Sequence, residues 1–210
     1  GVTANVKMNQ RIHEVDGVRG LYVYPNMGDG GCGSGAAMHV SWPGGVLPPF
    51  ETAYLGPEFT ADEIRAEIEK AGLPYDEPED LAATIAKLIH EGSIVARFAG
   101  RMEYGPRALG HRSILYRTDD PSVNDWLNER LQRTEFMPFA PATLVSEADR
   151  CYHNVDGAGD PARFMTVTFD CSDEMKQQSP GVVHCDGTAR PQLVDAETSP
   201  DLHGILEAYH

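Results

Sequence analysis

The chain has 210 residues and a formal net charge of −15, from 17 Lys and Arg against 32 Asp and Glu. This acidity argues against a nucleic-acid partner, because proteins that bind nucleic acids concentrate positive charge to displace counterions. No apolar run approaches the roughly 18 residues that a membrane helix needs, so no membrane partner is expected. The four cysteines contain no Cys-x-x-Cys pair, which predicts reduced thiols in a cytoplasmic protein.

Residues 1–45 differ in pattern from the rest of the chain. Val2–Val6 and Leu21–Tyr24 predict short strands. Between residues 28 and 35 glycine recurs at almost every second position, and the alanines that follow predict the start of a helix. A strand, a glycine-rich loop and a helix N-terminus together are typical of a turn that faces phosphate or nucleotide. A plain tight turn is the simpler interpretation and stays open.

The rest of the chain predicts a linker, residues 46–57, and one α/β domain, residues 58–210. The start of the linker is indicated by residues 43–49, which are rich in proline and glycine. In the domain, hydrophobic periodicity and capping residues set the expected elements. These are a helix from Thr60 to Gly72 that begins with a Thr60–Glu63 capping box, a helix over 81–92, a strand over 93–99, a helix over 121–132 with Trp126, Leu127 and Leu131 inward, a strand over 164–170, an extended segment over 182–194, and a helix over 202–209.

Residues 100–113, Gly-Arg-Met-Glu-Tyr-Gly-Pro-Arg-Ala-Leu-Gly-His-Arg-Ser, form the most informative segment. Its arginines, Arg101, Arg107 and Arg112, stand among glycines and a proline that restrict the backbone. A local cluster of cations in an acidic protein predicts a small anionic ligand, because the rigid guanidinium fork suits phosphate and carboxylate. The alternative is a set of surface arginines paired with some of the many carboxylates.

Three other residues of this segment are candidates for supporting roles. The hydroxyl of Ser113 is expected to donate to the same anion. A carboxylate among cations usually orients them, so Glu103 is expected to hold the guanidinium planes rather than to act as a general base. His111 is interpreted as a packing or hydrogen-bonding residue.

Two later regions carry further candidates. Asn124 and Asn128 lie four residues apart on a predicted helix, so both side chains can point at one ligand. The apolar segment 136–141 is either a core-facing loop or a wall on which a nucleotide stacks. Alternation along a predicted strand would place four polar side chains on one face, although an ordinary amphipathic strand gives the same pattern. The four are His184, Asp186, Thr188 and Arg190.

The segment 100–115, followed by Asn124 and by Pro138–Pro141, resembles the signature of the O-carbamoyltransferases, which include nodulation-factor and antibiotic-tailoring enzymes. Residues 184–192 resemble a second signature of that family. The resemblance covers essentially the whole chain, whereas the chain covers only the C-terminal part of such an enzyme. Many members carry arginine where this chain has Met137, which puts a basic contact at that position in doubt.

The resemblance implies an α/β fold in two parts. Residues 58–210 resemble the YrdC-like twisted mixed sheet with helices, which combines carbamoyl phosphate with Mg²⁺-ATP to give carbamoyl-adenylate. Catalytic roles then fall to Arg101, Arg107 and Arg112, through neutralisation of phosphate charge. The implied substrate-binding and ATP-binding residues are Glu103, Ser113, Asn124, Asn128, His184, Asp186, Thr188 and Arg190.

Residues 1–45 resemble the end of a Kae1-like, actin-like (ASKHA) lobe that passes the carbamoyl group to an acceptor hydroxyl. Asn5 and Gly28 match its adenylate-binding turns, and Asp29 matches an aspartate that binds iron together with two upstream histidines. One carboxylate holds a transition metal poorly, so iron is expected only in the full-length enzyme. The sequence of residues 134–144 is most similar to the nodulation-type members, which implies a sugar as acceptor. Resemblance to the full-length enzymes also implies a homodimer.

Two other functions stay open. Free-standing YrdC-type proteins form threonylcarbamoyl-adenylate for tRNA modification, although the acidic composition and the actin-like segment speak against that role. A catalytically silent module that binds nucleotides or partner proteins would keep the fold without the reaction. Dependence on carbamoyl phosphate or on threonine distinguishes these functions.

Overall fold

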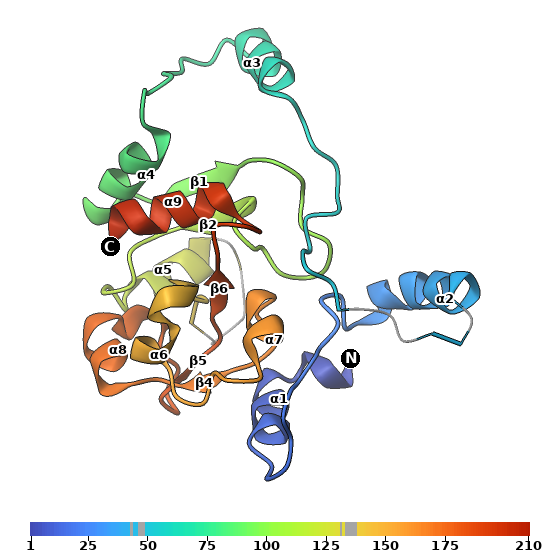
Figure 1. Ribbon diagram of the computed structural model, residues 1–210. Coiled ribbons are helices and arrows are strands. Elements are labelled where there is room, and N and C mark those ends of the chain that lie inside the picture. Colours follow the sequence, from blue (N-terminus) through green and yellow to red (C-terminus); the bar gives the residue numbers. More distant parts are fainter. Residues whose placement is uncertain (43, 46–48, 131, 133–137) are drawn as a thin grey trace.

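The computed structural model describes residues 1–42, 44–45, 49–130, 132 and 138–210. It shows a mixed α/β fold, as predicted (Figure 1). The described helices are α1 Val6–His13, α2 Cys32–Ser41, α3 Ala61–Lys70, α4 Leu81–His90, α5 Val123–Arg130, α6 Ala148–Cys151, α7 Gly159–Arg163, α8 Asp173–Gln178 and α9 Pro200–Tyr209, with 3₁₀ turns η1 Val2–Ala4, η2 Asp29–Gly31, η3 Val145–Glu147 and η4 Pro180–Val182. The described strands are β1 Val95–Phe98, β2 Arg112–Leu115, β3 Ala142–Leu144, β4 Phe169–Asp170, β5 Thr188–Ala189 and β6 Gln192–Val194.

Within the described residues these strands form three two-stranded sheets. β1 and β2 are an antiparallel hairpin in which Val95 lies opposite Leu115 and Phe98 opposite Arg112. β3 pairs with β6 in parallel, and β4 pairs with β5 in antiparallel orientation. The hairpin matters most for function, because the segment that connects its strands is the arginine-rich segment.

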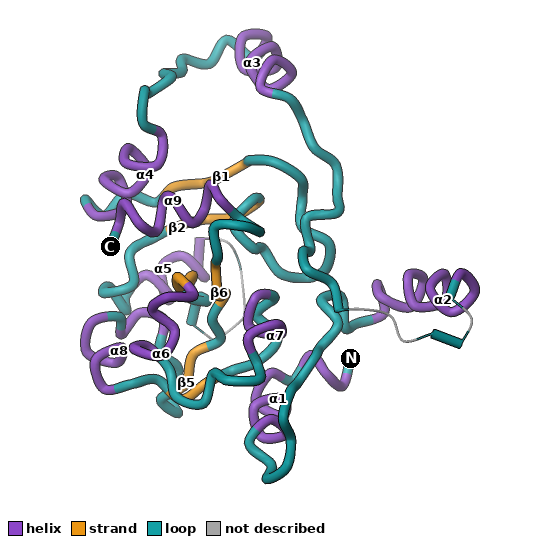
Figure 2. The backbone as a smooth tube through the Cα atoms, viewed as in Figure 1, coloured by secondary structure: helices purple, strands orange, loops and turns teal. Residues whose placement is uncertain are grey.

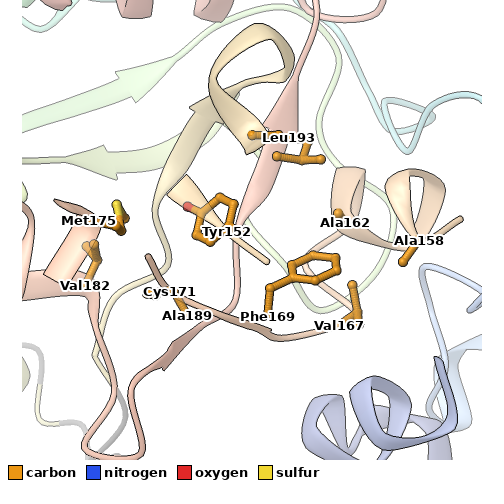
Figure 3. Packing of buried hydrophobic residues seen from close by; sticks show 11 residues of the cluster. Tyr152, Ala158, Ala162, Val167, Phe169, Cys171, Met175, Val182, Ala189 and Leu193 are labelled. Carbon is orange, nitrogen blue, oxygen red and sulfur yellow. The ribbon is translucent and has the colours of Figure 1, made fainter. Parts of the chain in front are cut away.

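The main hydrophobic core lies among α6, α7, α8 and the two small sheets β3–β6 and β4–β5 (Figure 3). Tyr152 and Phe169 are its largest side chains, with ring centroids 6.1 Å apart. The Tyr152 hydroxyl lies 2.7 Å from Thr143 Oγ1, so the one polar group of that ring is satisfied inside the core.

A second apolar cluster joins α4 to α9, which lie side by side (Figure 1). Ile85 and Ile89 of α4 pack against Ile205 of α9. The predicted apolar stripe of α4 is therefore confirmed. Its end is confirmed too, because Gly92 follows with a φ of +85°, a conformation that favours glycine.

The predicted capping box of α3 is present. Thr60 Oγ1 accepts a hydrogen bond from the Glu63 amide, and the Glu63 carboxylate accepts one from the Thr60 amide at 2.8 Å. Neither α3 nor α2 contains a buried residue. Both helices project from the rest of the molecule, α3 at the top of a long arch of loop (Figures 1 and 2).

The strands predicted at Val2–Val6 and Leu21–Tyr24 are wrong. Residues 2–4 form a 3₁₀ turn, and α1 begins after Asn5, whose side chain accepts from the Met8 amide at 2.9 Å and so caps the helix. Residues 21–24 form no strand. The strand prediction relied on the β-branched residues and overlooked the Asn5 cap, which starts a helix here.

The strand predicted over 164–170 is confirmed only at Phe169–Asp170. The preceding residues are buried, but they form hydrogen bonds with α1 and with carbonyls of α7 instead of with a neighbouring strand. Asn9 Nδ2 donates to the Thr166 carbonyl at 2.7 Å, and Thr168 Oγ1 donates to Gln10 Oε1 at 2.8 Å. These contacts lie far apart in sequence, so alternation of residue types could not reveal them.

Candidate functional site

The candidate site is the arginine loop, defined as residues 99–112, which connects β1 to β2. At its centre the Glu103 side chain is buried, with 7 % of the residue exposed. One of its oxygens, Oε1, accepts hydrogen bonds from the amides of Leu109 and His111, each at 2.8 Å, and of Arg112 at 3.1 Å. One carboxylate therefore fixes the returning half of the loop.

The environment of Glu103 keeps it ionised. Burial disfavours the charged form, but the amide hydrogen bonds from Leu109, Arg112 and His111 outweigh it and hold the pKa of the Glu103 carboxyl below its usual range. Glu103 was expected to hold guanidinium planes. Its hydrogen bonds go to backbone amides instead, because the loop folds back over the carboxylate and its own N–H groups are the nearest donors.

Side chains from outside the loop donate hydrogen bonds to two of its carbonyls. The Leu109 carbonyl accepts from the Tyr54 hydroxyl at 2.7 Å and from Gln192 Nε2, on β6, at 2.8 Å. The Gly110 carbonyl accepts from Arg97 Nη1 at 2.5 Å. The Tyr54 ring also stacks on the His111 ring, with centroids 3.8 Å apart. Because amides and carbonyls are both satisfied, the loop is ordered before any ligand binds.

A strap, defined as residues 53–57, runs alongside the outgoing half of the loop. The Gly56 amide donates to the Met102 carbonyl and the Met102 amide donates to the Pro57 carbonyl, both at 2.9 Å. A Cβ on Gly56 would lie 2.8 Å from that Met102 oxygen, so the two backbones approach closely enough to require glycine. The strap belongs to the predicted linker 46–57, of which residues 46–48 lie outside the described residues.

Two arginines of the loop, Arg101 and Arg112, donate to backbone carbonyls. Arg101 donates to the carbonyls of Leu55 and Gly56 on the strap, each at 3.2 Å. Arg112 donates to the Ala99 carbonyl at 2.6 Å and to the Gly100 carbonyl at 3.2 Å. These neutral acceptors fix the guanidinium groups without neutralising them.

The other arginines of the chain provide the contrast. Arg65, Arg117 and Arg150 each pair with a carboxylate within 2.9 Å. In the part of the chain that the structure describes, neither Arg101 nor Arg112 forms an ion pair with a carboxylate. The alternative of ordinary surface ion pairs therefore does not describe these two residues.

The remaining residues of the segment are placed as follows. Arg107 is half-buried on the loop, after Gly105 and Pro106. His111 packs and hydrogen-bonds as expected, since its Nδ1 lies 2.7 Å from the Arg101 carbonyl. Ser113 Oγ accepts from the Gly110 amide at 2.8 Å, so it also braces the loop. The Arg112 guanidinium lies over the Phe98 ring, 3.7 Å from its centroid.

The side chain of Asn124, on α5, makes hydrogen bonds to other segments of the fold. Asn124 Nδ2 donates to the Gly181 carbonyl at 2.7 Å, and its Oδ1 accepts from the Phe139 amide at 3.0 Å. Both ends of this side chain thus join three segments of the fold. Asn128 is half-buried one turn later.

On α5, Leu127 is buried and Trp126 half-buried, in line with the predicted inward face. Leu131, Phe136 and Met137 were also part of the predictions and lie outside the described residues.

The second predicted polar group lies on a turn and not on one continuous strand. Residues 184–187 form a tight turn in which the Gly187 amide donates to the His184 carbonyl at 2.8 Å and Gly187 has a φ of +78°. The strand prediction over 182–194 is therefore wrong at this point, because the glycine allows a reversal that alternation of residue types does not reveal. Strand structure is confined to β5 and β6.

The turn still gathers polar side chains around Asp186. Its Oδ1 accepts from Thr188 Oγ1 at 2.6 Å and lies 3.1 Å from His184 Nδ1, while its Oδ2 lies 3.0 Å from Lys7 Nζ on α1. Burial opposes ionisation of Asp186, but the hydrogen bonds from Thr188, Lys7 and His184 hold the pKa of its carboxyl far below the usual range. Arg190 follows the turn and is half-buried.

The N-terminal candidates lie at helix starts. Asn5 caps α1, and Gly28 precedes η2, on which Asp29 is exposed. Across the described residues there is no group of three or more His, Cys, Asp or Glu side chains that could hold a metal ion. Asp29 alone does not fit an iron site, and no chemistry is assigned to a metal there.

Sequence reasoning missed the residues that support the loop from other elements, namely Tyr54, Arg97 and Gln192. Arg97 was visible only as one of the clustered basic residues; its side chain is 7 % exposed, and burial lowers the pKa of its guanidinium. A hollow of about 540 Å³ lies elsewhere, among α4, α9, β2 and β3. None of the predicted polar site residues lines it, but Phe139, Ala140 and Pro141 of the predicted apolar wall do.

Comparison with known proteins gives a consistent result. Residues 86–210 match the family described as carbamoyltransferase C-terminus. The chain is 34 % identical to an uncharacterized protein of Methanocaldococcus jannaschii, 30 % identical to nodulation protein NolO of Bradyrhizobium diazoefficiens and 29 % identical to nodulation protein U of Sinorhizobium fredii. In each case the whole chain is covered, but only 35 %, 39 % and 36 % of the relative.

The described helices include none with the length and hydrophobicity needed to cross a lipid bilayer. The chain spans little more than a third of the curated relatives that it matches. The family match nevertheless covers more than half of this chain and includes the arginine loop. The chain belongs to the carbamoyltransferase family, of whose members it contains the C-terminal region.

Proposed function

We propose that the arginine loop binds carbamoyl phosphate next to Mg²⁺-ATP and forms carbamoyl-adenylate. The observation that carries this proposal is the pair of guanidinium groups, of Arg101 and Arg112, that backbone carbonyls fix on the loop. Arg101 and Arg112 are held by neutral carbonyls, so their positive charge stays available to an anion. Membership of the carbamoyltransferase family supports a carbamoyl donor as this anion, and we propose that the donor is carbamoyl phosphate.

The reaction needs little covalent chemistry from the protein. Hydrolysis of carbamoyl phosphate gives carbamate and inorganic phosphate. A carbamate oxygen then attacks the α-phosphorus of ATP, and the bond to the β-phosphate oxygen breaks to release pyrophosphate. The arginines of the loop neutralise the phosphate oxygens during both steps, and a fixed loop does so without reorganisation.

Several parts of the full reaction belong to the whole protein. In the whole protein, residues 58–210 would be the YrdC-like part, and a Kae1-like lobe would transfer the carbamoyl group to the hydroxyl of an acceptor molecule. A nodulation-type sugar as acceptor is part of this proposal, and the names of the relatives, nodulation protein NolO and nodulation protein U, support a link to nodulation. We also propose that the whole protein is a cytoplasmic homodimer, and that Asp29 would bind iron there only together with two upstream histidines.

The test is pyrophosphate release by this chain, measured with a coupled assay in ATP and MgCl₂. We expect pyrophosphate release to require carbamoyl phosphate. Arg107→Ala should abolish the release, whereas Arg65→Ala, on the exposed helix α3, should leave it unchanged. A requirement for threonine and bicarbonate instead would assign the tRNA-type synthase. Binding of ATP without release under either condition, in the full-length protein as well, would identify a silent binding module.

A further inference from the structure

Tyr104 of the arginine loop contacts the glycine-rich turn, defined as residues 28–31, through a cluster of hydroxyl groups. Its hydroxyl lies 2.6 Å from Ser34 Oγ, at the start of α2. Ser34 Oγ also lies 2.9 Å from the Tyr24 hydroxyl, and it donates to the Gly31 carbonyl at 2.9 Å. The two tyrosine rings meet edge to face, with centroids 6.2 Å apart. One serine thus joins the turn to the loop.

The backbone next to Tyr104 is held at the same junction. The Tyr104 amide donates to the Ala53 carbonyl of the strap at 2.6 Å. Gly105 has a φ of +113°, and a Cβ there would lie 3.1 Å from the Pro25 carbonyl oxygen, so the loop also approaches the segment before the turn closely. Tyr104 therefore lies where three separate parts of the sequence meet.

A short path of contacts leads from this junction to the arginines. Tyr104 is the chain neighbour of Glu103, whose carboxylate fixes the amides of Leu109, His111 and Arg112. A shift of the Tyr104 ring moves Glu103, and a shift of Glu103 loosens the returning half of the loop. The path contains only covalent neighbours and short hydrogen bonds, so it gives the turn and the arginines one common structural state.

We propose that Tyr104 is a positioning residue that couples the glycine-rich turn to the arginine loop, so that order at one is transmitted to the other. This inference deepens the proposed function and rests on it for the ligand, the anion bound by the loop. Partial burial raises the pKa of the Tyr104 hydroxyl, but its hydrogen-bond contacts with Ser34, Tyr24 and Asn26 outweigh burial and lower that pKa.

Hydrogen exchange of the ligand-free chain tests the coupling in both directions. Ser34→Ala removes the shared hydroxyl on the side of the turn, and we expect exchange at the amides of Leu109, His111 and Arg112 to become about three- to tenfold faster. Tyr104→Phe should accelerate exchange at the Gly31 amide, which donates to the Gly28 carbonyl. Changes confined to the mutated side would overturn the proposal, because a merely local role predicts them.

Two variants serve as controls. Tyr75→Phe removes a tyrosine hydroxyl that donates to Glu69 on the exposed arch, and it should leave both regions unchanged. Ser34→Thr keeps the hydroxyl and should restore wild-type exchange in the loop. If Tyr104→Phe does not fold, as seen by circular dichroism, the Ser34 pair alone still decides the question.

Carbamoyl phosphate then probes the functional consequence. In the wild type we expect this ligand to slow exchange at the glycine-rich turn as well as at the loop, and in Tyr104→Phe to slow it at the loop alone. Protection of the loop without any effect on the turn in the wild type contradicts the coupling and leaves the proposed function intact. No protection anywhere counts against the proposed function, while the ligand-free comparison still tests the coupling.

Discussion

Replacement of Glu103 by glutamine tests whether one carboxylate organises the arginine loop. In the structure a single oxygen of Glu103 accepts three amide hydrogen bonds, at 2.8, 2.8 and 3.1 Å. Glutamine keeps an oxygen at that position but removes the charge. Charge-assisted hydrogen bonds are roughly twice as strong as neutral ones, which contribute about 1 kcal/mol each, so up to about 3 kcal/mol is at stake. Because three donors share one oxygen, we expect a loss of about 2 kcal/mol.

Glu103→Ala should cost more, about 3–5 kcal/mol, because it leaves buried amides without an acceptor. The measurement is the free energy of unfolding in urea, with Glu79→Gln, on the exposed arch, as the matched control. The pKa of Glu103 is lowered in the folded state, so its stabilisation is present above the unfolded pKa of about 4.3 and is lost as pH falls through the folded value. The difference between wild type and Glu103→Gln should therefore shrink below about pH 4.

The account of Glu103 would be refuted if both variants unfolded within about 0.5 kcal/mol of the Glu79→Gln control, the range of ordinary surface substitutions. A difference that stayed constant down to pH 2 would also contradict it, because an acceptor whose strength comes from its charge must weaken on protonation.

Three further predictions concern the strap, the Tyr54 support of the loop, and the turn at residues 184–187. Gly56→Val should lower the free energy of unfolding by about 1–3 kcal/mol in urea denaturation, since the new Cβ would crowd the Met102 carbonyl; unchanged stability would contradict the close approach. Tyr54→Phe removes a donor to the Leu109 carbonyl but keeps the ring. We expect the free energy of unfolding in urea to fall by about 1 kcal/mol and amide hydrogen exchange in the loop to become faster. Asp186→Asn should flatten the acid side of the stability–pH curve below the unfolded pKa of about 3.9, because the folded carboxyl has its pKa lowered; a curve parallel to wild type would exclude this linkage.

Helices with local signals could be predicted from the sequence. Thr60 and Glu63 cap α3, and the apolar stripe of α4 ends before Gly92, as their spacing indicated. These features depend on neighbours within four residues, which a sequence displays directly. The strand predicted over 164–170 failed because its partners are side chains of α1, more than 150 residues away.

The candidate site divides in the same way. The arginine loop was predictable because the glycines, the proline and the arginines lie within one short segment. Its supports were not, because Tyr54 and Gln192 lie 55 and 83 residues from Leu109, whose carbonyl both side chains contact. Nor does the sequence distinguish a Glu103 that binds guanidinium groups from one that binds amides, since that choice depends on how the loop folds back.

The most direct test of the central claim is calorimetric titration of carbamoyl phosphate, with and without Mg²⁺-ATP, into the wild-type chain, Arg107→Ala and the control Arg65→Ala. The account predicts saturable binding by the wild type and by Arg65→Ala, and a loss of about 2 kcal/mol, or roughly thirtyfold in Kd, in Arg107→Ala. Equal weakening in both variants, or a folded wild type that binds neither ligand, would contradict an anion site on the arginine loop.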